Sequence, residues 1–298
     1  MTHDLDLHGV WVPLITPFAV DGSVDVKAIE RLCHEYLDAG AAGIVALGTT
    51  GESAALDHTE KTAVIEACSK ACASRDAQLM VGTGTNSTRT TIAATSALAG
   101  VPAVNSALVV VPYYVRPSEA GIVEHYRAVA ATSPVPVVAY NIPYRTGRGL
   151  GAGSLLELAA TQNIVGVKQA VGGIDTDTLE VLRDKPDTFH VLGGEDPFLL
   201  ATVLFGGSGA IAASAHVCTE RFVTMIDCAL TGKVEDARVH HEKLLKVITT
   251  GFAEPNPAIW KGVLHKQDRI ATPDVRAPMT NASEAAIERC LAAIALAL

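Results

Sequence analysis

The sequence predicts an α/β fold, a (β/α)8 TIM barrel with a C-terminal helical appendage. Eight short apolar runs rich in Val and Ile recur along the chain. Most of them lack an alternation of apolar and polar residues, which is typical of parallel strands covered on both faces. Segments with helical periodicity lie between the runs. Strands that alternate with helices in this way indicate a parallel sheet, and eight of them favour a closed barrel.

The predicted strands coincide with the apolar runs. They are Val10–Ile15, Gly43–Leu47, Leu79–Gly82, Ala107–Val111, Val135–Tyr140, Ile164–Lys168, His190–Leu192 and Ala210–Ala213. An open doubly wound sheet is the main alternative. It usually has about five or six strands and a glycine-rich phosphate-binding turn after the first one. No such turn follows the first run here, so the barrel is favoured.

Two helices near the N-terminus show the periodicity most clearly. Apolar residues recur every three or four positions in Val26–Ala39 and again in Thr59–Ala73. Asp25 is a candidate N-cap for the first of these helices, and Gly40 is a candidate C-terminal stop.

The C-terminal part of the chain has a different pattern. No strand signal follows Asp227, and Val234–Gly251 and Ser283–Leu298 have the periodicity of helices. We therefore predict a catalytic barrel domain over residues 1–226 and a C-terminal helical domain over residues 227–298.

Composition excludes several classes of protein. Of the 298 residues 49% are hydrophobic and 18% charged, which is incompatible with intrinsic disorder. The net charge of -9 argues against nucleic-acid binding, because a nucleic-acid partner requires a basic surface. A large chain with so little charge is expected to cover part of its apolar surface with a partner subunit.

Cysteine usage and hydropathy indicate the compartment. The six cysteines include no Cys-x-x-Cys pair, which is typical of reduced thiols in the cytoplasm. No apolar stretch approaches the ~20 residues needed to span a bilayer. We expect a cytoplasmic protein that does not cross a membrane.

One lysine lies at the end of a predicted strand. Lys168 follows a run with no other polar residue, and the catalytic residues of barrel enzymes lie at the carboxyl ends of strands. Lysine is rarely buried, so this side chain either extends to the rim or serves chemistry. Burial lowers the pKa of an amine, and the neutral amine attacks carbonyl carbon. No metal-binding cluster is evident at the other strand ends.

Three neighbouring features each have two interpretations. Tyr140 either fills the mouth of the barrel or relays a proton. The Gly48–Ser53 segment (GTTGES) is either a tight loop or a set of donors for a carboxylate. Arg145 forms either a salt bridge at the rim or a clamp on a carboxylate.

Seven motifs in order carry a resemblance to a known family. They are ITPF at 15–18, GTTGES at 48–53, GTGTNST at 82–88, VPYYVRPS at 111–118, YNIPYRTG at 140–147, VGVKQA at 165–170 and EPNP at 254–257. The chain resembles the dihydrodipicolinate synthase family, a group of pyruvate-dependent class I aldolases and lyases, from Gly9 to about Met279. The resemblance implies a barrel with a C-terminal helical domain and a homotetramer built from two tight dimers.

The resemblance also implies the catalytic residues. By this resemblance, Lys168 would form a Schiff base with pyruvate, and Tyr140 and Thr49 would belong to a proton relay. Tyr114 completes that relay from the neighbouring subunit, which makes dimerisation part of the active site.

Further residues are implied to bind the substrates. Thr50, together with Thr49, holds the pyruvate carboxylate, and Arg145 binds the carboxylate of L-aspartate 4-semialdehyde. Gly194 and Ile211 line the site. The implied product is 4-hydroxy-tetrahydrodipicolinate, an intermediate of lysine and diaminopimelate biosynthesis. Neither a metal nor an organic cofactor is needed, because the imine acts as the electron sink.

Two other readings of the function remain. Another pyruvate-dependent lyase, such as N-acetylneuraminate lyase or a 2-keto-3-deoxy sugar acid aldolase or dehydratase, is the nearest alternative. Arg145 favours the synthase because it supplies a charge for the semialdehyde. Tyr144, Gln169 and Gly172-Gly173 depart from the family pattern beside this substrate. A non-catalytic ligand-binding barrel is the third reading.

An effector site is the last feature that the resemblance implies. Family members inhibited by lysine carry a His and a Glu where this chain has Lys61 and Thr90. The retained positions of this site are Ser53, His58, Asn86 and Tyr113. Without the carboxylate that pairs with the effector's amine, we expect weak or no inhibition by lysine.

Overall fold

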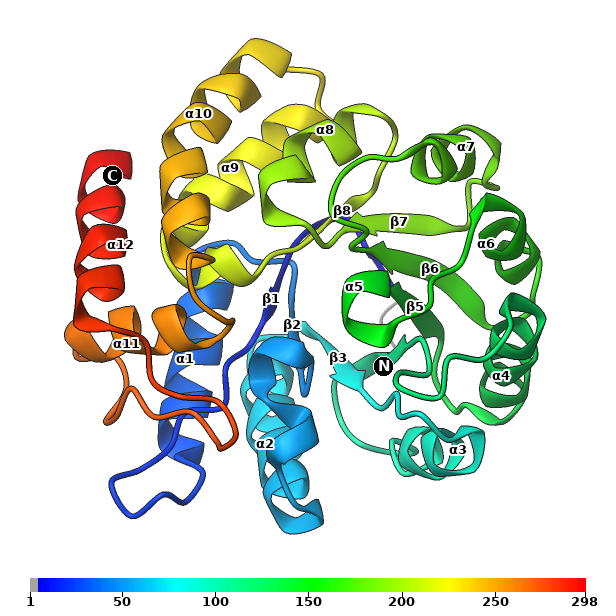
Figure 1. Cartoon of the computed structure of the whole chain (residues 1–298), viewed down its shortest axis with the longest axis horizontal. Coiled ribbons are helices and arrows are strands. Elements are labelled where there is room, and N and C mark those ends of the chain that lie inside the picture. Colours follow the sequence, from blue (N-terminus) through cyan, green and yellow to red (C-terminus); the bar gives the residue numbers. More distant parts are fainter. Residues whose placement is uncertain (1–4) are drawn as a thin grey trace.

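The protein is a closed barrel of eight parallel strands surrounded by helices (Figure 1). It is represented by a computed structural model, which describes residues 5–298. Each strand pairs with the next along the chain, and β1 pairs with β8 to close the barrel, with Trp11 opposite Ile211. The predicted (β/α)8 fold is confirmed.

All eight predicted strands are present, with bounds that shift by at most a few residues. The strands are β1 (Gly9–Pro13), β2 (Gly43–Ala46), β3 (Gln78–Gly82), β4 (Val104–Val110), β5 (Val137–Asn141), β6 (Ile164–Gln169), β7 (His190–Gly193) and β8 (Gly209–Ile211). The strands are buried on both faces, one toward the barrel interior and the other toward the helices, which explains why the sequence runs do not alternate.

The helices follow the predicted pattern. They are α1 (Val26–Asp38), α2 (His58–Ala73), α3 (Thr88–Ser96), α4 (Glu119–Thr132), α5 (Pro143–Thr146), α6 (Ala152–Ala159), α7 (Thr176–Asp184), α8 (Leu199–Leu204), α9 (Thr219–Leu230), α10 (Val234–Gly251), α11 (Ala258–Lys266) and α12 (Glu284–Ala297). Asp25 caps α1 as predicted, because its side chain accepts a hydrogen bond from the Ala28 amide. Asp57 caps α2 in a capping box with Glu60.

Apolar side chains fill the inside of the barrel. Trp11, Met80, Leu108 and Leu192 all lie there in one buried cluster. Gly43 leaves room for the largest of them, since a Cβ at this position would lie 2.5 Å from the Trp11 ring. The barrel is therefore a packed core whose chemistry is confined to its open end.

The C-terminal helices pack beside the barrel. Figure 1 shows α12 alongside α10, with α11 next to it, on the side of α1. Trp260, Val263 and Ile294 belong to the apolar cluster that joins these helices. The boundary predicted between residues 226 and 227 falls within α9, and the division into two domains stays a prediction. Among residues 5–298, no helix combines the length and hydropathy required to cross a membrane.

Candidate active site

Lys168 is the last residue but one of strand β6, and its side chain lines a pocket at the mouth of the barrel. Its side chain is buried, with only 6% of the residue exposed. Burial lowers its pKa to about 8, and the Arg145 charge adds to this effect, whereas the carboxylates of Asp196 and Glu195 oppose it. A substantial fraction of this amine is therefore neutral near physiological pH and able to act as a nucleophile.

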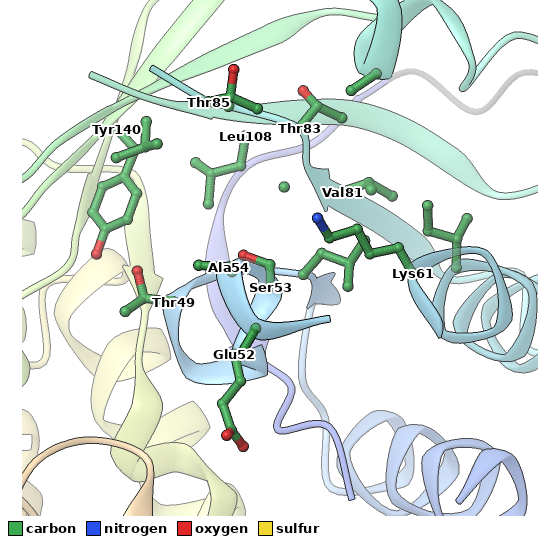
Figure 2. Close-up of a pocket in the computed structure, with 18 of the residues that line it drawn as sticks. Thr49, Glu52, Ser53, Ala54, Lys61, Val81, Thr83, Thr85, Leu108 and Tyr140 are labelled. Carbon is green, nitrogen blue, oxygen red and sulfur yellow. The ribbon is translucent and has the colours of Figure 1, made fainter. Parts of the chain in front are cut away.

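Tyr140 lies beside Lys168 on the neighbouring strand. The two residues are opposite each other in the pairing of β5 with β6, and the Lys168 Nζ lies 4.3 Å from the centre of the Tyr140 ring. Burial raises the pKa of Tyr140 to about 12, and a hydrogen bond with Thr49 counteracts part of this rise. Figure 2 shows the Tyr140 hydroxyl directed toward Thr49. A neutral phenol next to a hydroxyl can pass a proton to or from a group bound at Lys168.

Gly194 provides the space that Lys168 occupies. A Cβ at Gly194 would lie 2.8 Å from the Lys168 Cε and 3.0 Å from its Cγ. The Gly194 amide donates to the Gln169 carbonyl at 2.8 Å, which fixes the strand end against β6. Any other residue at this position would displace the lysine side chain.

A tight turn after β2 supplies hydroxyl groups to the same pocket. Thr49–Gly51 forms one turn of 3-10 helix in which Thr50 is buried. The Thr16 hydroxyl donates to the Gly51 carbonyl at 2.7 Å, and a Cβ at Gly51 would lie 3.0 Å from the Leu14 carbonyl oxygen. The glycine therefore lets the turn pack against the end of β1, which brings both threonines to the pocket of Lys168.

Two carboxylates of the site were not singled out from the sequence. Asp196 is buried, and its Oδ1 accepts from the Ser214 amide at 2.7 Å. Burial raises the pKa of Asp196 and also that of the half-buried Glu195. Their position after the seventh predicted strand, in the sequence Gly-Gly-Glu-Asp at 193–196, indicates that they lie near the site, because residues at the strand ends gather at the barrel mouth.

The pocket also contains residues from the C-terminal part of the chain, which follows α9. Asn256 precedes α11, and its side-chain amide donates to the Thr50 hydroxyl at 3.0 Å. It belongs to the EPNP motif, but the sequence alone gave it no role. Asn256 and Phe252 both line the pocket of Lys168, so residues after 230 contribute to the site.

Arg145 and Tyr144 lie on the short helix α5 at the opening of the pocket, and both line it. Both are exposed, and the Arg145 guanidinium lies 5.3 Å from the centre of the Tyr144 ring. Figure 1 shows α5 in front of β5 and β6. A cation so placed can receive an anionic second substrate, and the aromatic ring beside it narrows the entrance.

Gln169 belongs to a buried hydrogen-bonded chain behind the pocket. Its Oε1 accepts from Asn141 at 3.0 Å, and its Nε2 donates to the Thr178 hydroxyl at 3.0 Å. Asn141 also exchanges hydrogen bonds with the backbone of Leu150, which holds the end of the loop after α5. The neutral Gln169 thus has a structural role beside Lys168 and does not face the substrate pocket.

Tyr114 is the one predicted catalytic residue that the single chain does not bring to the pocket. It is 86% exposed, in a left-handed backbone conformation with φ of +70°. It does not line the pocket of Lys168, whereas Ile211 does. This exposure is compatible with a position in a subunit interface.

A larger cavity of about 980 Å³ adjoins the pocket. Thr49, Tyr140 and Arg145 line it at one end. The predicted effector residues Ser53, His58 and Tyr113 also line it, together with Lys61 and Thr90, whereas the exposed Asn86 does not. Figure 2 shows the Lys61 side chain extending into this cavity from α2.

Within residues 5–298, no three His, Cys, Asp or Glu side chains cluster in a way that could hold an ion.

Comparison with known proteins identifies the family. The profile of the dihydrodipicolinate synthetase family matches residues 6–296. The chain belongs to this family. A 4-hydroxy-tetrahydrodipicolinate synthase of Moorella thermoacetica is 38% identical over 281 residues, which cover 94% of this chain and 95% of the relative.

Solved structures of family members have the same fold. A dihydrodipicolinate synthase from Acinetobacter baumannii, complexed with pyruvate, superposes with a TM-score of 0.93 at 31% identity, over 98% of this chain and 99% of that one. A monomeric dihydrodipicolinate synthase variant superposes with a TM-score of 0.93 at 28% identity, over 97% and 96%. The family predicted from the seven motifs is confirmed.

Proposed function

We propose that this protein is a Schiff-base-forming synthase that condenses pyruvate with L-aspartate 4-semialdehyde to give 4-hydroxy-tetrahydrodipicolinate. The observation that carries the proposal is Lys168, a buried amine with a pKa of about 8 in a pocket lined by Thr50, Tyr140 and Arg145. The activity printed for relatives such as the Moorella thermoacetica enzyme supports it. The product places the reaction in lysine and diaminopimelate biosynthesis.

The first half of the reaction activates pyruvate. Thr49 and Thr50 hold its carboxylate at the turn after β2, and the neutral Lys168 amine attacks its keto carbon. Loss of water gives a protonated imine, which withdraws electrons from the adjacent methyl group. The methyl group then loses a proton to give an enamine, with Tyr140 and Thr49 moving protons. The imine supplies the electron sink, so the proposal requires no metal or organic cofactor.

The second half forms the carbon–carbon bond. Arg145 binds the carboxylate of the semialdehyde, and the enamine attacks its aldehyde carbon. The amino group of the semialdehyde then attacks the imine carbon, which closes the ring and releases Lys168. Arg145 favours this acceptor because its guanidinium matches a carboxylate with two parallel hydrogen bonds.

Assembly is part of the proposal. We infer that Tyr114 completes the proton relay of a neighbouring subunit, in a homotetramer that is a dimer of dimers. The exposed Tyr114 and Val115 supply the apolar surface for such a contact. A monomeric variant among the structural relatives makes the oligomeric state a question for measurement.

Regulation and location complete the proposal. Lys61 places a cation in the cavity where an effector amine is expected. We therefore expect lysine to inhibit weakly or not at all, and an inhibition constant in the low micromolar range would contradict this. All six cysteines are free thiols, which supports a cytoplasmic location.

Borohydride trapping tests the function directly. With pyruvate present, borohydride is expected to reduce the imine and leave one 1-carboxyethyl group, derived from pyruvate, on Lys168, which peptide mass spectrometry detects. Lys168→Ala is expected to abolish both the labelling and the condensation, whereas Lys266→Ala, a change on the surface, is expected to preserve them. Labelling at another lysine would overturn the assignment.

A coupled assay tests the second substrate. Pyruvate with aspartate semialdehyde is expected to turn over, whereas N-acetylneuraminate and 2-keto-3-deoxygluconate are not. Turnover of a sugar acid without condensation would identify the chain as another pyruvate-dependent lyase.

A further inference from the structure

Asn256 lies within hydrogen-bond distance of a residue that the proposed function assigns to pyruvate binding. Its Nδ2 donates to the Thr50 hydroxyl at 3.0 Å across 206 positions of sequence. The Asn256 Oδ1 is buried and has no hydrogen-bond partner among residues 5–298. Over the described part of the chain, the one hydrogen bond of this side-chain amide is thus to the turn after β2.

This contact prevents the Thr50 proton from pointing toward the Asn256 amide nitrogen. A threonine hydroxyl has one hydrogen and accepts through its lone pairs. Since the Thr50 oxygen accepts from Asn256, its hydrogen is left to be donated elsewhere, and within residues 5–298 it donates to no other group. Thr50 and Lys168 line the same pocket. An anion bound there would receive the hydrogen of Thr50.

The segment that carries Asn256 is attached to the turn after β2 at further points. Five residues beyond Asn256, Lys261 pairs with Glu52 of the same GTTGES segment at 2.7 Å, and both side chains are buried. The other oxygen of Glu52 accepts from the Arg276 amide at 2.7 Å. The C-terminal segment is thus attached to the turn on both sides of Gly51. Figure 2 shows that the Glu52 carboxylate points away from Thr49 and Tyr140, so it anchors the turn without facing the site.

We propose that Asn256 is a positioning residue of the pyruvate carboxylate site, which orients the Thr50 hydroxyl so that it donates to the bound carboxylate. This inference rests on the proposed function, because it assumes that Thr50 receives pyruvate. It assigns the C-terminal helical region a part in substrate binding and not only in folding.

Two substitutions of Asn256 test the inference. Asn256→Asp keeps the shape but replaces the donor by an acceptor, which turns the Thr50 hydrogen away from the substrate. We expect the pyruvate concentration for half-maximal borohydride trapping at Lys168 to rise about tenfold or more. Asn256→Ala lets water replace the donor and is expected to give a smaller rise of about three- to tenfold. At saturating pyruvate the rate is expected to change by less than about threefold in both variants.

Controls separate this role from a structural one. Gln162→Glu makes the same change from an amide to a carboxylate on the exposed surface, away from the site, and is expected to leave the pyruvate dependence unchanged. Thermal unfolding shows whether each variant is folded. If Asn256→Asp does not fold, the pyruvate dependence of Asn256→Ala provides the test. A pyruvate dependence within twofold of the unmodified protein in a folded Asn256 variant would overturn the inference. Absence of trapping in the unmodified protein would instead overturn the proposed function.

Discussion

At the scale of single residues, the site depends on how far burial lowers the pKa of the Lys168 amine. Lys168 has a pKa of about 8 in place of the ordinary 10.5, and desolvation is the main cause. The neutral fraction of the amine therefore increases as the pH rises through 8 and levels off above it. The nearby Asp196 carboxylate keeps this pKa from falling further.

The pH dependence of imine formation follows from these charges. The initial rate of trapping with pyruvate is expected to rise about tenfold per pH unit below 8 and to reach a plateau above it. Asp196→Asn removes a charge that favours the protonated amine, so the midpoint is expected to move to lower pH. The Asn Oδ1 can still accept from the Ser214 amide, which preserves the local fold. The rate is measured by stopping the trapping reaction at several times and quantifying the labelled protein by mass spectrometry. A midpoint that moves to higher pH in the Asp196→Asn variant would contradict this account.

Gly194→Ala tests the space around the nucleophile. The new methyl group would lie 2.8 Å from the Lys168 Cε and 3.0 Å from the Ala170 Cβ, so the lysine side chain would have to move aside and Ala170 would have to shift slightly. We expect trapping and condensation to fall about a hundredfold or more, because a displacement of about 1 Å costs that much. The melting temperature is expected to change by only a few degrees.

Gly153→Ala is the matched control for this change. The position lies on α6, and nothing surrounds a Cβ there within 4 Å. Because alanine favours a helix more than glycine does, we expect full activity and a gain of about 0.5–1 kcal/mol in the free energy of unfolding. Equal activities of the two variants would show that Gly194 is not required for space.

At the scale of elements, a buried ion pair connects the turn after β2 to α11. Lys261 Nζ lies 2.7 Å from Glu52 Oε1 and 3.9 Å from the centre of the Phe18 ring. Burial lowers the pKa of Lys261 to about 8, and the attraction of Glu52 opposes that shift. The pair is costly to bury, so each charge depends on the other.

Removing one member of the Lys261–Glu52 pair is therefore expected to lower the free energy of unfolding more than removing both members does. Lys261→Met leaves the Glu52 carboxylate buried without a cation, which is expected to lower the free energy of unfolding by about 3–5 kcal/mol. The double variant Glu52→Gln/Lys261→Met is expected to recover most of this loss. Urea denaturation measures both. Lys266→Met, which breaks the exposed pair with Glu284, serves as the control, with an expected change within about 1 kcal/mol. A single variant as stable as the double one would contradict the coupling.

The same scale shows what the sequence could predict. Strands, helices and the N-cap at Asp25 follow from local patterns, and the structure confirms them within a few residues. The proximity of Lys168 and Tyr140 also follows from the sequence, because adjacent strands of a parallel sheet end side by side, and the structure pairs the two residues across β5 and β6. The contact of Asn256 with Thr50 spans 206 positions, and no local pattern indicates which residues meet after the C-terminal helices fold back. That contact required the structure.

At the scale of the whole molecule, the site of one chain lacks the tyrosine that the family motifs assign to it. Tyr114 is 86% exposed and lies outside the pocket of Lys168. If the residue acts on a neighbouring subunit, two different inactive chains should repair each other. The role of Tyr114 therefore depends on how the subunits assemble.

Complementation between variants tests this arrangement. Lys168→Ala and Tyr114→Phe are each expected to lose most activity. Chains co-expressed with different affinity tags and purified as mixed tetramers are expected to regain roughly one quarter of the activity, because about half of the randomly paired tight dimers are mixed and one of the two sites in each mixed dimer holds both residues. No recovery in verified mixed assemblies would place Tyr114 in the site of its own chain or outside catalysis.

The closure of the barrel has a consequence for how the protein is made. Gly9 of the first strand pairs with Gly209 of the last, so the sheet has free edges until residues near 211 have left the ribosome. Asn256 reaches Thr50 later still, after the helix Val234–Gly251 has been synthesised. Lys168 and Tyr140 can thus be in place before Asn256 reaches Thr50. If Asn256 orients Thr50 as proposed, the site for the pyruvate carboxylate is completed only after the C-terminal helices fold against the barrel.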